Sequence, residues 1–234
     1  MSLSTIAKAG DLLDLFDGSR SELGVSEAAG RLGLPKSSAH DLLAALAETG
    51  LLERTERGRY RLGWRVLALS RAMLETSELR RSARPTVRGL SRHLGRTVHL
   101  ATLQGAELAY LDKVEGATSP PIEVSGVGRR PPARGTALGK VLLAHRPDPD
   151  ASLDEELREV RERGFARASE ELVPGICCFA SPVRGPSGTV VAALSVSVGA
   201  AEAPRREREY LRLVGAGAAR ISRQLCRGAR SATG

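Results

Sequence analysis

The segment GTALGKV, residues 135–141, contains the glycines and the lysine that a phosphate-binding loop uses to hold a nucleotide. A phosphate-binding loop has four residues between its glycines, and a serine or threonine that reaches Mg²⁺ follows its lysine. Here three residues separate Gly135 from Gly139, and Val141 follows Lys140. We therefore do not expect nucleotide hydrolysis.

The histidines and cysteines lack the spacing of a metal site. None of the four histidines has a histidine four residues away or lies in an HExxH motif. The cysteines form neither a CxxC pair nor a disulfide framework, so we expect reduced thiols and no metal site. His99 lies in an apolar run, and we expect it to be a structural or pocket residue.

Cys178 is the one candidate for nucleophilic catalysis. Its thiol lies inside the apolar run GICCFASPV, residues 175–183, with no evident base to activate it. A cysteine in such a run is more often a small buried apolar residue. A small cysteine-dependent hydrolase or transferase, with an N-terminal interaction module, is therefore the alternative function.

Two groups of residues have the chemistry for binding nucleic acid. The first group provides a cation, hydroxyls and an imidazole, and consists of Lys36, Ser37, Ser38 and His40. The second belongs to a basic island within residues 54–65, from which we select Arg54, Arg57 and Arg59. We predict that Arg57 and Arg59, which flank Gly58, hold phosphate or reach the minor groove.

The first 65 residues have the pattern of three short helices and a hairpin. Glycines at 18, 33 and 50 would end helices over about 3–17, 26–32 and 35–49, with Ser26 as the N-cap of the second. In the third, a buried stripe is predicted at Ala39, Leu42, Leu43 and Leu46. With a hairpin around Arg57 and Gly58, these elements predict a winged helix-turn-helix, whose second motif helix enters the major groove.

An apolar helix is predicted from Trp64 to about Ser77. Trp64, Leu67 and Met73 would leave large apolar side chains uncovered, so we expect this helix to pair with its copy in a second subunit. The predicted organisation is a DNA-binding domain at 1–63, a linker and dimerisation helix at 64–79, and a second domain at 80–234, to which the family resemblance described below assigns effector binding.

The pattern of residues 80–234 predicts an α+β domain with an antiparallel sheet. Strands are expected at TVHLATL, ELAYLDKV, PIEVSGV, GICCFASPV and TVVAALSVSV. Helices are expected near 85–94, at TALGKVLLAH, at 152–163 with a capping box of Ser152 and Glu155, and at about 204–226. Arginines recur every fourth residue from Arg80 to Arg96, and we expect Pro85 to interrupt their helix. They form either a solvated face, which we favour, or an auxiliary contact to phosphates.

Charge and hydropathy limit the class of protein. The 234 residues carry a net charge of +8, but residues 1–65 are neutral, with nine basic and nine acidic residues. Net charge alone therefore does not mark the N-terminal segment for nucleic acid. No apolar run is long enough to span a membrane, and the N-terminus lacks the features of a signal peptide, so we expect a cytoplasmic protein.

Five stretches in this order resemble the IclR family of bacterial transcriptional regulators: LGLPKSSAHDLLAALAETGLLER, GRYRLGWRVLAL, GTALGKVLLA, EELVPGICCFASPV and GTVVAALSVSV. The resemblance covers nearly the whole chain. It implies a winged helix-turn-helix, a dimerising linker helix, and a C-terminal GAF-like domain that binds a small metabolite and biases DNA affinity. It implies neither catalysis nor a cofactor.

The chain departs from the family pattern at two positions. Family members commonly have a basic residue where this chain has Asp41, and a carboxylate there cannot bind phosphate. It would face a cytosine amino group, lie clear of the DNA or pair with an arginine of the wing, and we favour the arginine pair. At Ala168 members often carry an acidic residue, so an effector that needs that carboxylate is in doubt.

The resemblance also implies where the effector lies. Alternate residues of two predicted strands would line the site, and the start of the GTALGK helix would close it with free backbone N–H groups. Such a site suits a small, carboxylate-bearing molecule. The candidate effector-binding residues are Ala137, Leu138, Cys178, Ala180, Ser195 and Ser197.

The leading hypothesis is a ligand-responsive DNA-binding transcriptional regulator without enzyme activity. Its expected partners are a double-stranded DNA operator, a small-molecule effector and further copies of itself, as a homodimer or a dimer of dimers. Repression and activation stay open, because they depend on where the operator lies.

Overall fold

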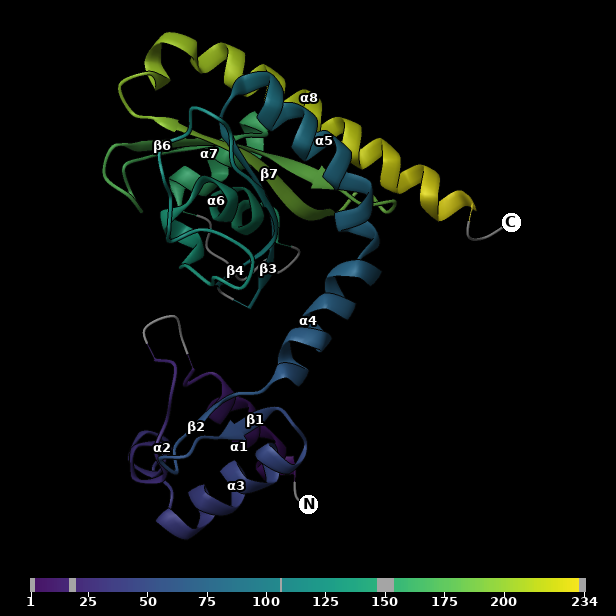
Figure 1. Cartoon of the computed structure of the whole chain (residues 1–234). Coiled ribbons are helices and arrows are strands. Elements are labelled where there is room, and N and C mark those ends of the chain that lie inside the picture. Colours follow the sequence, from purple (N-terminus) through teal and green to yellow (C-terminus); the bar gives the residue numbers. More distant parts are fainter. Residues whose placement is uncertain (1–2, 17–19, 106, 147–153, 232–234) are drawn as a thin grey trace. The chain divides into compact units, whose positions relative to one another are not determined.

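The computed structural model describes residues 3–16, 20–105, 107–146 and 154–231 (Figure 1). The chain divides into two compact units, Met1–Glu75 and Thr76–Gly234, and each has its own buried core.

The N-terminal unit contains three helices and a two-stranded hairpin. These elements are α1 (Leu3–Leu13), α2 (Val25–Leu32), α3 (Lys36–Glu48), β1 (Leu52–Arg54) and β2 (Tyr60–Leu62). Its core includes Leu12, Leu43, Leu52 and Tyr60, all of them buried. The predicted helix-turn-helix and hairpin are therefore confirmed.

Two helix ends in this unit differ from the prediction. α1 ends at Leu13 rather than near residue 17, and the predicted stop at Gly18 lies outside the described residues. α2 begins at Val25, one residue before the predicted cap Ser26, and Gly24 is its N-cap. Helix ends vary by a residue or two when no side chain caps them, as is the case for α2.

α4 (Trp64–Thr76) begins at the predicted residue, directly after the hairpin. None of its residues is buried within the chain. Its start is fixed to the N-terminal unit by backbone and side-chain hydrogen bonds. Gly63 donates its N–H to the Leu51 carbonyl at 2.8 Å, and Arg65 Nη1 donates to the Thr49 carbonyl at 2.6 Å.

The C-terminal unit is a five-stranded antiparallel sheet between two helical layers (Figure 1). The strand order is β4-β3-β7-β6-β5. The strands are β3 (Thr97–Gln104), β4 (Glu107–Val114), β5 (Ala166–Ser169), β6 (Ile176–Arg184) and β7 (Val190–Gly199). One face packs against α5 (Glu78–Leu94) and α8 (Ala203–Ser231). The other packs against α6 (Ala137–Ala144), with α7 (Glu155–Arg163) beside it, which confirms the predicted α+β class.

Two predictions for this unit were wrong, and one strand was missed. Pro85 lies inside a continuous α5, because the buried stripe through Ala83, Val87 and Leu90 offsets the one backbone hydrogen bond that proline cannot make. Residues 121–127, the predicted strand PIEVSGV, form turns and irregular backbone instead of a strand. β5 was not predicted, because four residues give too short an alternation.

The start of α7 also differs from the prediction. Asp154 is its N-cap, and its side chain accepts a hydrogen bond from the Leu157 N–H at 3.1 Å. Ser152, the predicted cap, lies outside the described residues. Within the described part of the chain, no helix is long and apolar enough to cross a membrane.

Candidate nucleic-acid interface and ligand pocket

The first turns of α3 present polar side chains on an exposed surface. Pro35 is extended at the N-cap position, and Ala39, Leu43 and Leu46 fix the opposite face of the helix in the core. The four predicted DNA-binding residues of this helix, Lys36, Ser37, Ser38 and His40, are all exposed. The helix therefore offers a cation, two hydroxyls and an imidazole at the end that such motifs place in the major groove.

The arginines of the wing, the β1–β2 hairpin, differ in their exposure and contacts. Gly58, with a φ of +71°, closes the turn by donating to the Thr55 carbonyl at 2.9 Å. Arg54 and Arg57 are exposed on this hairpin. Arg59 instead turns back to the helices, where its Nη2 donates to Glu27 Oε2 at 3.1 Å and to the Glu22 carbonyl at 3.1 Å.

Arg59 therefore differs from Arg57, although the sequence suggested that both flank an open tip. The hydrogen bond from Arg59 holds the pKa of Glu27 below its usual range. A guanidinium already engaged by Glu22 and Glu27 has fewer free donors for phosphate, so Arg59 fixes the position of the wing.

The favoured arginine partner of Asp41 was wrong. Among the described residues, the side chain found beside its carboxylate is His40, whose Nδ1 lies 3.4 Å from Asp41 Oδ1. The Asp41 side chain is 81% exposed. No wing arginine neutralises this carboxylate, so facing a base amino group and lying clear of the DNA are the interpretations that stay open.

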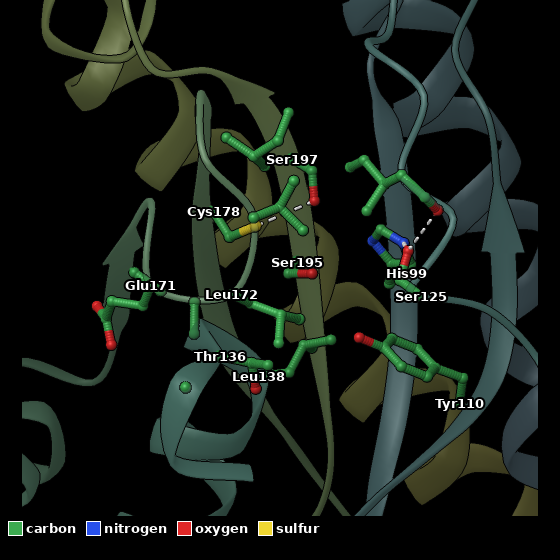
Figure 2. A pocket seen from close by; sticks show the side chains of 16 residues that line it. His99, Tyr110, Ser125, Thr136, Leu138, Glu171, Leu172, Cys178, Ser195 and Ser197 are labelled. Carbon is green, nitrogen blue, oxygen red and sulfur yellow. Dashed lines mark hydrogen bonds between the residues drawn. The ribbon is translucent and has the colours of Figure 1, made fainter. Parts of the chain in front are cut away.

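A pocket lies between the sheet and the start of α6 (Figure 2). Its volume is about 40 Å³, which corresponds to room for about three water molecules. β3, β4, β6 and β7 supply one wall, and the segment 171–173 and α6 supply the others. Five of the six predicted effector-binding residues line this one pocket: Ala137, Leu138, Cys178, Ser195 and Ser197.

Ala180 does not line the pocket. It lies opposite Ser195 in the β6–β7 register and opposite Ala166 in the β5–β6 register. These pairs place it on the expected face, but there it is fully buried in the core that packs against α6. Ala168, the second departure from the family pattern, does line the pocket.

Sequence reasoning missed most of the polar pocket wall from β3 and β4. His99 lies opposite Ser195 in the β3–β7 register, which brings its ring to the pocket. Its Nε2 is 2.9 Å from Ser125 Oγ, and its ring centroid is 5.4 Å from that of Tyr110. Burial lowers the pKa of His99 to about 3, so the imidazole is neutral at physiological pH.

The thiol and hydroxyls of the pocket are also uncharged. Cys178 Sγ lies 3.2 Å from Ser197 Oγ, and burial raises the pKa of Cys178 to about 11. Ser195 is almost completely buried and faces the pocket, and Figure 2 shows the Tyr110 hydroxyl pointing into the same space. In the described part of the chain neither hydroxyl has a protein hydrogen-bond partner, so both are available to a ligand.

Charged groups are held at the edge of the pocket. No lysine or arginine is among its described lining residues, and Glu171 is the one carboxylate. Glu171 accepts a hydrogen bond from Lys140 Nζ at 2.7 Å, and Lys140 also binds Glu156 at 2.5 Å. Burial alone would lower the pKa of Lys140, but these two carboxylates raise it, so the ammonium stays charged and occupied.

The start of α6 is fixed tightly against the preceding turn. Thr136 Oγ1 accepts a hydrogen bond from the Gly139 N–H at 2.9 Å. A Cβ atom at Gly139 would collide with the Ala133 carbonyl of the 3-10 turn η1 (Ala133–Gly135), so only glycine fits there. This packing places the first residues of the helix, Ala137 and Leu138, in the pocket wall.

Comparison with known proteins identifies both units. Residues 5–56 match the IclR helix-turn-helix domain, and residues 71–152 and 148–223 match the C-terminal domain of bacterial transcriptional regulators of the IclR type. The transcriptional regulator XynR of Escherichia coli is 33% identical over 83% of this chain and 86% of its own length. The glycerol operon regulatory protein of Streptomyces coelicolor is 31% identical over 89% of each chain.

Solved structures share the fold. The IclR protein of Thermotoga maritima is 29% identical, with a TM-score of 0.69 over 96% of this chain and all of that one. An IclR homologue from Microbacterium hydrocarbonoxydans, complexed with 4-hydroxybenzoate, is 24% identical, with a TM-score of 0.77 over 94% of this chain and 98% of that one. The matched domains and the similarity along the chain show that this protein belongs to the IclR family of bacterial transcriptional regulators.

Proposed function

We propose that this regulator binds operator DNA through α3 and the wing, and that a small molecule in the C-terminal pocket changes its DNA affinity. The observation that carries the ligand half is the pocket itself, where the hydroxyls of Ser195 and Tyr110 have no protein hydrogen-bond partner among the described residues. Buried polar groups without partners are rare unless a ligand or water uses them.

The DNA half of the proposal depends on the exposed polar groups of α3 and the wing. Lys36, Ser37, Ser38 and His40 would contact base edges and phosphates, and Arg54 and Arg57 would contact phosphates. Arg59 would contribute indirectly, because its bonds to the acidic groups of residues 22 and 27 fix the wing.

The ligand that this pocket favours is small and bears a carboxylate. The first N–H groups of α6 carry partial positive charge at the pocket wall, and they would bind a carboxylate although the described lining residues include no cationic side chain. Ser195, Tyr110 and neutral His99 would hold a hydroxyl or carbonyl at the other end. That a structural neighbour is complexed with 4-hydroxybenzoate, itself a small carboxylate, supports this class.

We propose that α4 couples the two events in a homodimer or a dimer of dimers. Trp64 is 76% exposed and Leu67 60% exposed within one chain, and large apolar residues on one helix normally need a cover. A second copy would cover them. Ligand would then alter DNA affinity by favouring one arrangement of the dimer over another. Like its family, the protein would act in the cytoplasm, where operators lie.

The alternative of a cysteine-dependent enzyme receives little support. A pKa of about 11 keeps the Cys178 thiol protonated at neutral pH, whereas a nucleophile needs its thiolate. His99 Nε2 is hydrogen-bonded to Ser125, and the hydrogen bond of the Cys178 sulfur is to Ser197. The relatives named above are regulators.

The test selects a duplex from a random-sequence pool and screens small molecules by their effect on thermal unfolding. The panel contains small hydroxy and keto carboxylates, together with the matching amides, which lack the charge. We expect a carboxylate to raise the unfolding midpoint more than its amide, and to change the affinity for the selected duplex. Failure to select any preferred duplex would contradict the DNA half, and a panel in which amides bind equally well would contradict the carboxylate.

A further inference from the structure

The outer surface of the α5 and α8 layer carries arginines without acidic partners. The two helices pack side by side on one face of the sheet (Figure 1). α5 exposes Arg81, Arg88 and Arg92 opposite its buried stripe. α8 exposes Arg205, Arg208, Arg212, Arg220 and Arg223 along its outer side. We define these eight residues as the basic face.

Most other arginines of the described chain are paired. Arg96 binds Glu202 at 2.6 Å, Arg163 binds Glu159 at 2.5 Å and Arg167 binds Glu207 at 3.3 Å. No ion pair is found for the eight residues of the basic face within the described part of the chain. Glu209 lies close enough to Arg212 for electrostatic interaction, but its carboxylate is paired with Arg206 at 2.7 Å.

The acidic residues of α5 and α8 lie away from most of the basic face. The carboxylates of α8 occur near its start, and from Arg212 onward its described residues include no aspartate or glutamate. α5 has its one acidic residue, Glu78, at its first position. From Arg212 to Arg223 the helix rises about 16 Å, so its guanidinium groups are spread along a line rather than gathered at one point. A linear, evenly charged partner fits this arrangement better than a small anion.

A groove runs between α5 and α8 within the basic face. Its described lining includes Pro85, Gly89, Leu213, Ala216 and Gly217, which are small or apolar, and Arg220 stands at its edge. Acidic side chains are missing from this described lining. Like charges on both sides oppose contact with the same face of a second copy.

We propose that the basic face is a second DNA contact, which binds duplex phosphates without sequence preference while the helix-turn-helix reads the operator. This inference rests on the proposed function in one respect, namely that the chain binds duplex DNA through α3 and the wing. Unpaired arginines of the described chain also gather on the wing, where DNA is the proposed partner, which favours the same polyanion here. Phosphate contacts of this kind add affinity and salt dependence but no specificity.

The test uses the full-length chain and a duplex of about 40 base pairs of arbitrary sequence, titrated between about 50 and 200 mM salt. One variant carries Arg81→Gln, Arg88→Gln and Arg92→Gln, and a second carries Arg212→Gln, Arg220→Gln and Arg223→Gln. The control carries Arg129→Gln, Arg146→Gln and Arg161→Gln, which removes three exposed positive charges elsewhere in the same unit. A fourth variant, Arg54→Ala with Arg57→Ala, alters the wing alone.

We expect each basic-face variant to flatten the dependence of log K on log salt by about two units, and the control to leave it unchanged. The proposal is overturned if both basic-face variants keep the salt slope of the parent, or if the control loses as much slope as they do. The basic face would then be a solvated surface or a contact for an acidic protein. The wing variant separates the two claims. If the wing variant flattens the salt slope and the basic-face variants do not, only this inference is contradicted. If the basic-face variants flatten the slope and the wing variant does not, only the role of the wing is contradicted.

Discussion

Tyr110 and Asp112 lie two residues apart on β4 but face opposite sides of the sheet. In the β3–β4 register Ala101 pairs with Tyr110 and Leu100 with Asp112, so Leu111 is an extra residue that forms a bulge. Tyr110 therefore faces the pocket, and Asp112 faces α5. Arg80 donates to the Leu111 carbonyl at 2.9 Å, which ties the bulge to the first turn of α5.

Asp112 is the counter-charge for two arginines of α5. Its carboxylate is nearly buried, 3.7 Å from Arg80 Nη2 and 3.8 Å from Arg84 Nε. Replacing Asp112 by Asn keeps the shape but leaves Arg80 without its counter-charge. Because the distances are long and Arg84 is partly exposed, we expect Asp112→Asn to lower the free energy of unfolding by about 2 kcal/mol.

Urea unfolding of the full-length chain measures this loss. The matched control is Glu75→Gln, which breaks the exposed pair with Arg71 at 2.7 Å and should cost at most about 0.5 kcal/mol. If the two variants lose the same stability, the bulge contact with α5 has no structural importance.

The acid sensitivity of stability should depend on His99. Its pKa is about 3 when folded, against an ordinary value near 6.5, so below about pH 6.5 the unfolded chain binds the proton and the folded chain does not. The contribution of neutral His99 to the free energy of unfolding is therefore fully present above about pH 6.5 and is lost as the pH falls toward 3. The slope in that window is about 1.4 kcal/mol per pH unit.

Comparison of the parent with His99→Gln and His99→Asn isolates this effect from the other titrating groups. Between about pH 6 and about pH 5, the parent should lose about 1.2 kcal/mol more than either variant. Parallel stability curves for all three proteins would show that His99 is not buried as a neutral group.

The pocket thiol should resist alkylation. With a pKa of about 11, Cys178 has very little thiolate at about pH 8, and Cys177 is fully buried. We expect iodoacetamide to modify partly exposed Cys226 first and Cys178 at least about tenfold more slowly than a free thiol. Mass spectrometry of peptides follows each site. Faster labelling of Cys178 than of Cys226 would revive the catalytic alternative.

Arg57 and Arg59 should separate DNA binding from wing stability. Arg57→Ala removes an exposed cation, so we expect the salt slope of DNA binding to fall by about one unit with no change in the unfolding midpoint. Arg59→Ala breaks the bonds to Glu22 and Glu27, so we expect a lower midpoint. Salt titrations and thermal unfolding of both variants give the comparison. Identical behaviour of the two would mean that the hydrogen bonds of Arg59 do not hold the wing.

Local patterns were sufficient for much of the fold. The buried stripe of α3 and the long apolar runs of β6 and β7 predicted those elements, because each pattern is set by the faces that the element buries. α5 was predicted only in part, since proline disfavours a helix and packing over many residues overrides it at Pro85. Residues 121–127 formed no strand because the carbonyls of Ile122 and Ser125 accept hydrogen bonds from Lys113 Nζ.

Part of the pocket was predicted by the resemblance to the IclR family, which implied the start of α6, together with the alternation of side chains along β6 and β7. Ser195 and Ser197 alternate with apolar residues, which marks one face of β7. Tyr110 reaches the pocket because the bulge sets the register of β4, and His99 because β3 pairs with β7. Strand order and bulges depend on contacts between distant segments, so no local pattern contains them.

The central claim is that pocket and DNA affinity are linked, and linkage must be reciprocal. The most direct measurement uses the panel compound that most raises the unfolding midpoint. The affinity of the protein for the selected duplex is measured with and without this compound, and its affinity for the compound is measured with and without the duplex. We predict one factor of about 5 to 150 in both directions, lost in Ser195→Val, which removes a free pocket hydroxyl. A compound that needs Ser195 to bind, yet leaves the affinity for the duplex unchanged, would contradict the account.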